Sequence, residues 1–259
     1  MKKLSDRVYY VGVNDDTTTL FEGLWPLPYG VSYNSYIVVD EKVALIDTVE
    51  HDFQSEYLDN IHDAIGDRDI DYLVVNHMEP DHSSLTAYML EKYPQMKIVA
   101  NAKTVPMLKG YYGTAEDRII VMKEGECLSL GSCTLNFYMV PMVHWPETMV
   151  TWLEEEGTLF SGDAFGTFGS IDEDVVDGED TFLQFRDEMM RYYSNIVGKY
   201  GTPVQSALKK LSGLDVMRIC STHGPVWENE VNAVVDLYDR MSRYEVGRGV
   251  CIVYGSMYG

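Results

Sequence analysis

Seven residues with metal-ligand side chains occur in one ordered series along the 259-residue chain. The series runs through His77, Glu79, Asp81, His82, His144, Asp163 and His223, the first four of them within one six-residue stretch. Together they supply four imidazoles and three carboxylates. Such a set can hold two metal ions and leave room for an exogenous ligand. The series therefore predicts a dinuclear metal site.

The ligand types favour iron over zinc. A dinuclear zinc hydrolase site built from histidines would carry His at the position of Glu79. A carboxylate in place of an imidazole makes the ligand set harder and more anionic, which suits non-haem iron or manganese. Zinc also accepts carboxylates, so it stays open as a substitute.

Strand ends are expected to position these ligands. Residues 71–76 form a short apolar stretch that predicts a buried strand immediately before His77. Residues 158–161 and 216–220 predict strands before Asp163 and His223 in the same way. Ser83 and Ser84 are expected to cap a helix over residues 85–93, and Gly162 and Gly224 to allow tight turns beside the ligands.

The wider pattern alternates strands with amphipathic helices. Strands are predicted over residues 8–13, 35–39, 43–46, 72–76, 98–100, 119–122, 134–140, 149–153 and 159–161. Helices are predicted over residues 53–65, 85–92, 102–112, 181–197, 204–211 and 228–243. This order favours an α/β protein built as an αββα sandwich over a singly wound parallel sheet, although the pattern alone leaves both open.

At this point the chain resembles the flavodiiron proteins, also called A-type flavoproteins. Their signature is His-x-Glu-x-Asp-His followed by His, Asp and His at these separations, on a metallo-β-lactamase-like fold. Further segments are similar as well, at residues 29–36, 144–147, 161–166, 192–196 and 221–225. The resemblance extends over nearly the whole chain.

The resemblance implies a di-iron centre. It assigns His77, Glu79 and His144 to one iron and Asp81, His82 and His223 to the other, with Asp163 as the bridging carboxylate. Members of the family reduce dioxygen to water, nitric oxide to nitrous oxide, or both. We therefore expect a gas substrate, and we expect Tyr192 or Tyr193 to offer a hydrogen bond or proton near the site. Electrons would come from a donor such as rubredoxin or a flavin domain, within a homodimer or tetramer.

Two segments depart from the family pattern. Many relatives carry a histidine where this chain has Glu22, between Phe21 and Gly23, so a preference for oxygen or nitric oxide does not carry over. Residues 249–259 look like the first strand and phosphate-loop start of a flavodoxin-like FMN domain, following a metal domain over residues 1–248. The loop residues are Ser256, Met257, Tyr258 and Gly259. Because the helix that should follow is missing, we expect no FMN in this chain.

Composition narrows the class of protein. A net charge of −21 argues against nucleic acid and against anionic membrane surfaces as partners. No apolar stretch reaches membrane-spanning length and no signal peptide is recognised, so a cytoplasmic location is expected. Cys220 lies three residues before His223, but it ends an apolar strand and is expected to pack in the core.

Three functions remain open at the level of sequence. The first is a di-iron oxygen or nitric oxide reductase module. The second is a dinuclear metal-dependent hydrolase of the same superfold, acting on a thioester or phosphodiester through a metal-activated water. The third is a metal-binding module without turnover. Glu79 and the flavodoxin-like end favour the reductase.

Overall fold

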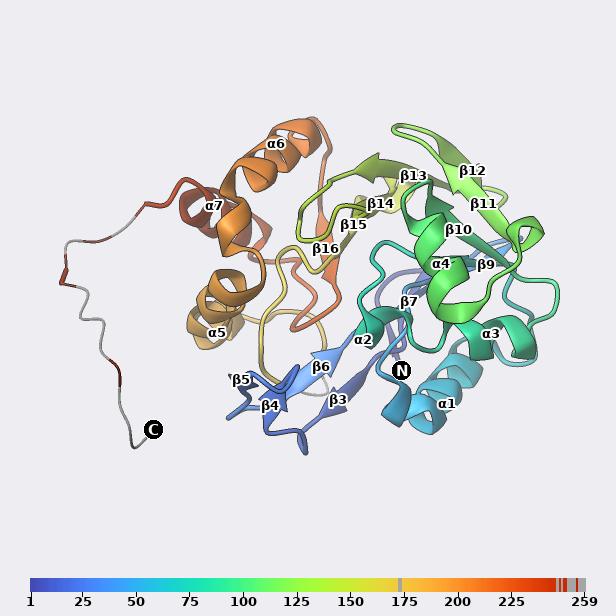
Figure 1. Ribbon diagram of the computed structural model, residues 1–259, viewed down its shortest axis with the longest axis horizontal. Helices are drawn as coiled ribbons and strands as arrows, with labels where there is room; N and C mark the ends of the chain where they lie inside the picture. The colour runs from blue at the N-terminus through green and yellow to red at the C-terminus, as the bar shows by residue number, and fades with distance from the viewer. Residues whose placement is uncertain (172–173, 246, 248, 251–254, 256–259) are drawn as a thin grey trace.

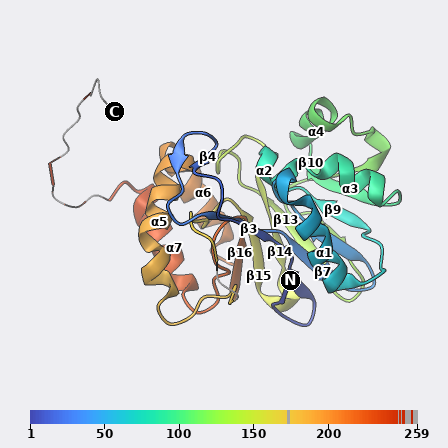
Figure 2. The ribbon, with the colours of Figure 1, turned by 90° about the horizontal axis from the view of Figure 1, so that it is seen from below.

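Two β-sheets lie face to face, and helices cover the outer side of each. The computed structural model describes residues 1–171, 174–245, 247, 249–250 and 255. Figure 1 shows α5, α6 and α7 on one side of the paired sheets and α1, α3 and α4 on the other. Figure 2 shows the same four layers after a quarter turn. The predicted αββα sandwich is confirmed.

The first sheet combines antiparallel and parallel pairing. Its strands, in spatial order, are β1 (Lys2–Lys3), β2 (Val8–Tyr10), β7 (Tyr36–Val39), β8 (Val43–Ile46), β9 (Tyr72–Val74), β10 (Lys97–Asn101) and β11 (Ile119–Met122). From β8 to β11 the strands are parallel. Parallel neighbours need crossover segments. The crossovers here contain α1 (Gln54–Ile65), α2 (Pro80–Ser83), α3 (Thr86–Lys92) and α4 (Thr104–Tyr112).

The second sheet is mostly antiparallel. Its strands are β12 (Cys127–Ser129), β13 (Thr134–Met139), β14 (Met149–Leu153), β15 (Thr158–Gly162) and β16 (Arg218–Ser221). Only β15 and β16 pair in parallel within the described part of this sheet. The crossover between them contains α5 (Thr181–Ile196) and α6 (Gly201–Leu211), and α7 (Val231–Ser242) follows.

Two small ribbons and four 3₁₀ turns complete the described elements. The ribbons pair β3 (Val13–Asp15) with β6 (Val31–Tyr33) and β4 (Leu20–Phe21) with β5 (Trp25–Pro26). The 3₁₀ turns are η1 (His51–Phe53), η2 (Glu116–Arg118), η3 (Glu154–Glu156) and η4 (Gly198–Tyr200). None of the helices in the described ranges is both long and apolar enough to span a membrane.

Both faces of the central strands are buried. In β7, Ile37 belongs to the apolar cluster that includes the helices, whereas its neighbour Val38 belongs to the cluster between the two sheets. In β8, Leu45 belongs to the cluster that includes the helices and Ile46 to the cluster between the sheets. Successive side chains of a strand point to opposite faces. This explains why these strands read as continuous apolar runs in the sequence.

Some sequence predictions differ from the structure in detail. Residues 8–13 form two strands, β2 and β3, because the chain passes from the first sheet to a ribbon. The predicted cap at Ser83 and Ser84 is wrong. A helix already begins at Pro80, and the Ser83 hydroxyl donates to the carbonyl oxygens of Met78 and Glu79. Cys220 is buried between the sheets, as predicted.

Candidate metal centre

The seven predicted ligands come from four segments, each of which follows a strand; Asp81 and His82 lie on α2 and the other five lie in loops. Those segments follow β9, β13, β15 and β16, so strands of both sheets contribute. All seven residues are buried, with 8% or less of each residue exposed. Residues separated by up to 146 positions in sequence therefore meet in one interior site, as expected for ligands on loops that a rigid scaffold positions.

The ligand side chains form two groups, each with its ligand atoms within 4.8 Å of one another. The first group is His77, Glu79, His144 and Asp163. The second group is Asp81, His82 and His223. Each group offers both imidazole nitrogens and carboxylate oxygens, so each has the donor types for one metal ion.

Asp163 lies between the two groups. Its Oδ2 is 2.9 Å from Nε2 of His144, in the first group. Its Oδ1 is 2.9 Å from Nε2 of His82, in the second group. The hydroxyl of Thr222 donates to the same Oδ1 at 2.6 Å and fixes the orientation of the carboxylate. The two oxygens of one side chain thus face different groups, which is the geometry of a bridging carboxylate.

Several buried polar atoms at the site make no well-oriented hydrogen bond to the described residues, although four of them lie 2.9–3.3 Å from another candidate ligand atom. They are both carboxylate oxygens of Asp81, Oδ2 of Asp163, and Nε2 of His82 and of His223. Buried polar groups in proteins are almost always paired, and an unpaired one costs free energy. Coordination to metal ions would satisfy these atoms. The donor set therefore fits a dinuclear metal centre.

The electrostatics of the site favour the protonated imidazoles of His82 and His144. Burial lowers the pKa of His82, but Asp81 and Asp163 raise it more, to about 9. Burial likewise opposes protonation of His144, and its contacts with Asp163 and Glu79 raise its pKa to about 9. The same contacts outweigh burial at Asp163 and Glu79 and hold the pKa of both carboxyls below the usual range. Metal ions would replace these protons as counter-charges.

The two predicted glycines adopt conformations that favour glycine. Gly162, directly before Asp163, has φ of +58°. Gly224, directly after His223, has φ of +77°, and a Cβ there would lie 2.1 Å from Oγ1 of Thr167. A side chain at position 224 would therefore be both strained and obstructed.

Glu147 was not predicted as a functional residue, although it lies in the similar segment 144–147. Its Oε1 lies 2.9 Å from Nδ1 of His77 and accepts a hydrogen bond from the amide of Met78 at 3.0 Å. Burial raises the pKa of Glu147, but the contact with His77 outweighs it and lowers the pKa. The sequence feature that could have identified Glu147 is its position three residues after the candidate ligand His144.

Asp47 was also missed. It follows β8 with φ of +54°, an uncommon conformation for a residue other than glycine. Its carboxylate accepts hydrogen bonds from the backbone and side-chain nitrogens of Asn76, at 2.8 and 3.0 Å, and so fixes the residue before His77. Asn76 in turn accepts from the hydroxyl of Thr151 at 2.7 Å, on the second sheet. A strained Asp at a strand end is a signal of function, but the strain is visible only in the structure.

The two predicted tyrosines of α5 face different surroundings. The ring of Tyr192 lies 5.5 Å from the ring of His223, and burial together with Asp163 and Glu79 raises its pKa well above the usual value. The ring of Tyr193 packs 5.0 Å from Tyr238 on α7. Consecutive helical residues point about 100° apart. Tyr192 is therefore the one placed beside a candidate ligand.

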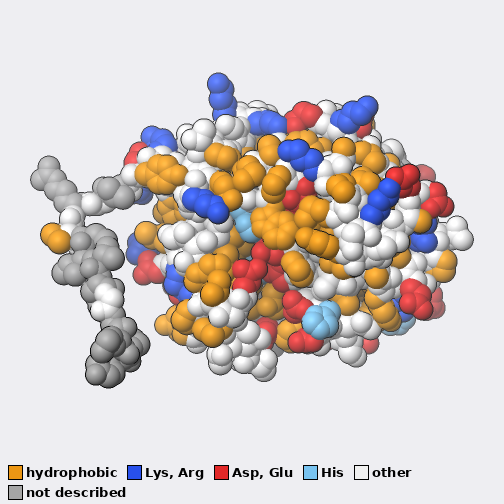
Figure 3. Space-filling model, in the orientation of Figure 1, with side chains coloured by type: hydrophobic (Ala, Val, Ile, Leu, Met, Phe, Trp, Pro, Cys, Tyr) orange, Lys and Arg blue, Asp and Glu red, His pale blue; other side chains and the backbone are white. Residues whose placement is uncertain are grey.

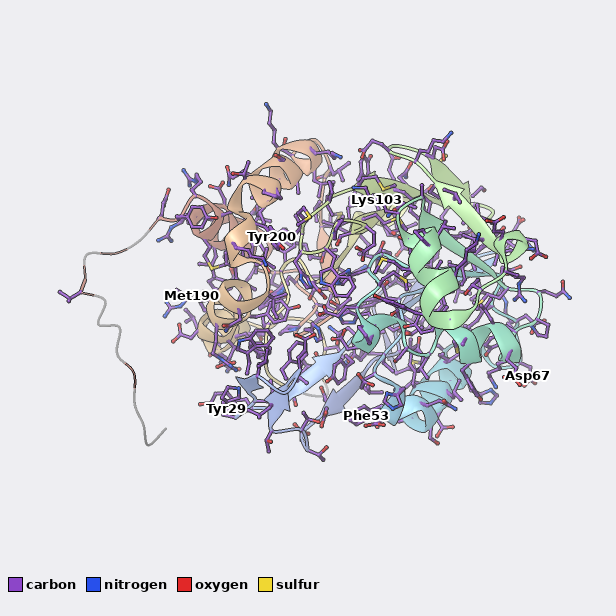
Figure 4. All side chains as sticks on the ribbon, viewed as in Figure 1. Tyr29, Phe53, Asp67, Lys103, Met190 and Tyr200 are labelled. Carbon is purple, nitrogen blue, oxygen red and sulfur yellow. The ribbon has the colours of Figure 1, made fainter. Side chains whose placement is uncertain are left out.

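A pocket of about 370 Å³ opens beside the first ligand group. It is lined by Glu22, Trp25, Glu79, His144, Trp145, Ser194, Asn195, Ile196, Lys199 and Tyr200. Burial and its contact with Glu79 raise the pKa of Glu22 to about 8. Figure 3 shows hydrophobic side chains in the middle of the face that Figure 1 presents, with acidic ones directly below them. Figure 4 places Tyr200, at the start of α6, on this same face.

The predicted FMN-loop residues Ser256, Met257, Tyr258 and Gly259 lie outside the residues that the structure describes.

Known proteins are similar to this chain in sequence and in fold. A family model described as "ODP family beta lactamase" matches residues 31–224. The anaerobic nitric oxide reductase flavorubredoxin of Escherichia coli is 33% identical over 98% of this chain and 54% of its own length. The chain spans between 52% and 64% of the length of curated relatives that it matches.

Solved structures of known proteins are similar to this chain in fold. The flavodiiron protein of Giardia intestinalis has a TM-score of 0.88 and 31% identity, covering 94% of this chain and 59% of that one. Rubredoxin:oxygen oxidoreductase of Desulfovibrio gigas has a TM-score of 0.87 and 31% identity, covering 93% and 61%. The chain belongs to the ODP family of β-lactamase-like domains and corresponds to the metallo-β-lactamase-like di-iron domain of flavodiiron proteins.

Proposed function

We propose that this chain is the di-iron module of an oxygen or nitric oxide reductase. The observation that carries the proposal is the pair of ligand groups joined by Asp163, with the carboxylate of Glu79 in the first group. When bound, a di-iron centre would supply electrons for the reduction of a diatomic gas. The names of the relatives support both gases, because one is a nitric oxide reductase and another an oxygen oxidoreductase.

Each group of residues has a distinct task in this proposal. His77, Glu79 and His144 would hold one iron, Asp81, His82 and His223 would hold the other, and Asp163 would bind both. The pocket beside Glu79 and His144 admits the gas. Tyr192, beside His223, donates a hydrogen bond or proton to the bound gas, because burial keeps its phenol protonated. Tyr193 packs against α7 and stabilises the fold.

Electrons must come from outside the part of the chain that the structure describes. We propose a flavin domain or rubredoxin as the donor, in a homodimer or tetramer, in line with the names flavorubredoxin and rubredoxin:oxygen oxidoreductase. Trp25, Trp145 and Tyr200 give the pocket an aromatic lining, against which a redox partner can dock. A chain with a net charge of −21 will make such docking depend on salt.

The alternative is a dinuclear hydrolase, which the names of the relatives do not favour. Metal analysis separates the two. Protein expressed in iron-replete medium and purified without oxygen should contain about two irons per chain and gain visible-region absorption on oxidation. Two zincs per chain together with esterase activity would contradict the reductase and support the hydrolase.

A further inference from the structure

The outer nitrogens of the candidate histidine ligands have different partners. Nδ1 of His77 lies 2.9 Å from a carboxylate oxygen of Glu147. Nδ1 of His223 donates instead to a neutral acceptor, the backbone oxygen of Ser32, at 2.7 Å. Nδ1 of His82 is buried and has no hydrogen-bond partner within the part of the chain that the structure describes. The partner of a ligating histidine fixes its tautomer and orientation and tunes its basicity, so these three imidazoles are not equivalent.

Glu147 is held rigidly in its place. Only 2% of the residue is exposed. Its Oε1 also accepts from the amide of Met78, and its backbone oxygen accepts from the side-chain amide of Asn101. Because Glu147 follows His144 by three residues and contacts His77, it joins the loop of His77 and Glu79 to the loop of His144. A rigid partner of this kind holds Nε2 of His77 toward the metal position.

The second ligand group has no equivalent hydrogen-bonded carboxylate among the described residues. Asp47 is a buried carboxylate whose charge acts on His82. Its hydrogen bonds, however, come from the backbone and side chain of Asn76. In the first group, Nδ1 of His77 therefore contacts a carboxylate. In the second group, Nδ1 of His223 contacts a backbone carbonyl, and Nδ1 of His82 has no partner among the described residues.

We propose that Glu147 is a positioning residue that makes the two metal positions unequal, so that the position of His77, Glu79 and His144 binds its ion more tightly and fills first. A carboxylate behind the imidazole strengthens its donor character and locks the ring before metal arrives. The inference rests on the proposed dinuclear centre but not on its chemistry with gases.

Titration of the metal-free chain with Co²⁺, followed by visible absorption, tests the proposal. The wild-type chain should bind two ions in two resolved steps. Glu147→Gln, which keeps the shape but loses the charge, should weaken the tighter step about 10- to 100-fold and leave the weaker step unchanged. His223→Asn should remove the weaker step and keep the tighter one, which assigns each step to a position.

Asp177→Asn is the matched control. Asp177 is also a buried carboxylate, but it accepts backbone amides of Glu228, Asn229 and Glu230 before α7, and it belongs to neither ligand group. This variant should titrate as the wild type does.

The Co²⁺-loaded wild type should also show a shifted, slowly exchanging NMR signal from the Nδ1 proton of His77, and Glu147→Gln should accelerate its exchange.

Glu147→Asp keeps the charge on a shorter side chain and should give an intermediate affinity, which covers the case in which Glu147→Gln does not fold. Equal weakening of both steps, an unchanged titration in the Glu147 variants, or the same loss in Asp177→Asn would overturn the role of Glu147 while leaving the dinuclear centre in place. A wild-type chain that binds no Co²⁺ would overturn the centre itself. Failure to react with gases would bear only on the proposed reductase.

Discussion

Replacing Asp163 by Asn should weaken metal binding at both positions at once. The two carboxylate oxygens lie 2.9 Å from Nε2 of His144 and of His82, so one side chain serves both groups. Asn has nearly the same shape, and its oxygen can still accept the hydrogen bond from Thr222. The substitution therefore removes mainly one negative charge. Two unit charges about 4 Å apart interact by about 4 kcal/mol at an effective dielectric constant of about 20.

That free energy corresponds to about a thousandfold in affinity, and a divalent ion loses at least as much at each position. The assay is competition for iron or Co²⁺ with a chelator of known affinity, followed by metal analysis per chain. His223→Asn is the contrast, because His223 belongs to only one group and its loss should mainly empty that position. Equal, single-site loss in both variants would refute the bridging assignment, and no loss in either would refute the site.

Three further predictions follow from the same geometry. Glu79→His should shift the preference from iron toward zinc when both are offered in competition, and an unchanged ratio would show that Glu79 does not select the metal. The free energy of unfolding of the metal-free chain should fall as pH rises, because His82 and His144 have folded pKa values of about 9 against about 6.5 when unfolded. This stabilisation is fully present below pH 6.5 and is lost as the pH rises through 9. Its loss should lower the free energy of unfolding by on the order of 1–3 kcal/mol per histidine. The metal-loaded chain should show no such fall. Tyr192→Phe should keep the metal content and slow gas reduction by about a hundredfold, while Tyr193→Phe should react at the wild-type rate; equal rates in the two variants would remove Tyr192 from the chemistry.

The ligand series could be predicted because each of its parts is local. His77, Asp163 and His223 each follow an apolar strand within a few residues, and the residue types themselves specify metal chemistry. The order of strands and helices was predictable for the same reason, since their periodicities are local signals, whereas the pattern alone left the αββα sandwich and a singly wound parallel sheet both open. The bridging position of Asp163 came from the family resemblance, and the structure shows its two oxygens facing different groups.

The supporting residues could not be predicted, because their role depends on contacts across the fold. Glu147 contacts His77 across 70 residues of sequence, and Thr151 reaches Asn76 from the other sheet. The shortest strands were missed because two- or three-residue segments such as β4 and β5 carry too little periodicity. The different surroundings of Tyr192 and Tyr193 likewise depend on where α5 packs, which the helical pattern alone does not specify.

Rapid mixing of the iron-loaded, chemically reduced chain with nitric oxide or dioxygen tests the central proposal most directly. Oxidation of the iron is followed by visible absorption, and nitrous oxide or oxygen consumption is quantified per chain. The proposal predicts a single turnover in which two irons are oxidised for each nitrous oxide formed from two nitric oxides, or four irons, from two chains, for each dioxygen reduced to water. This turnover should be lost in Asp163→Asn. A chain that holds two irons yet stays reduced in the presence of both gases would contradict it.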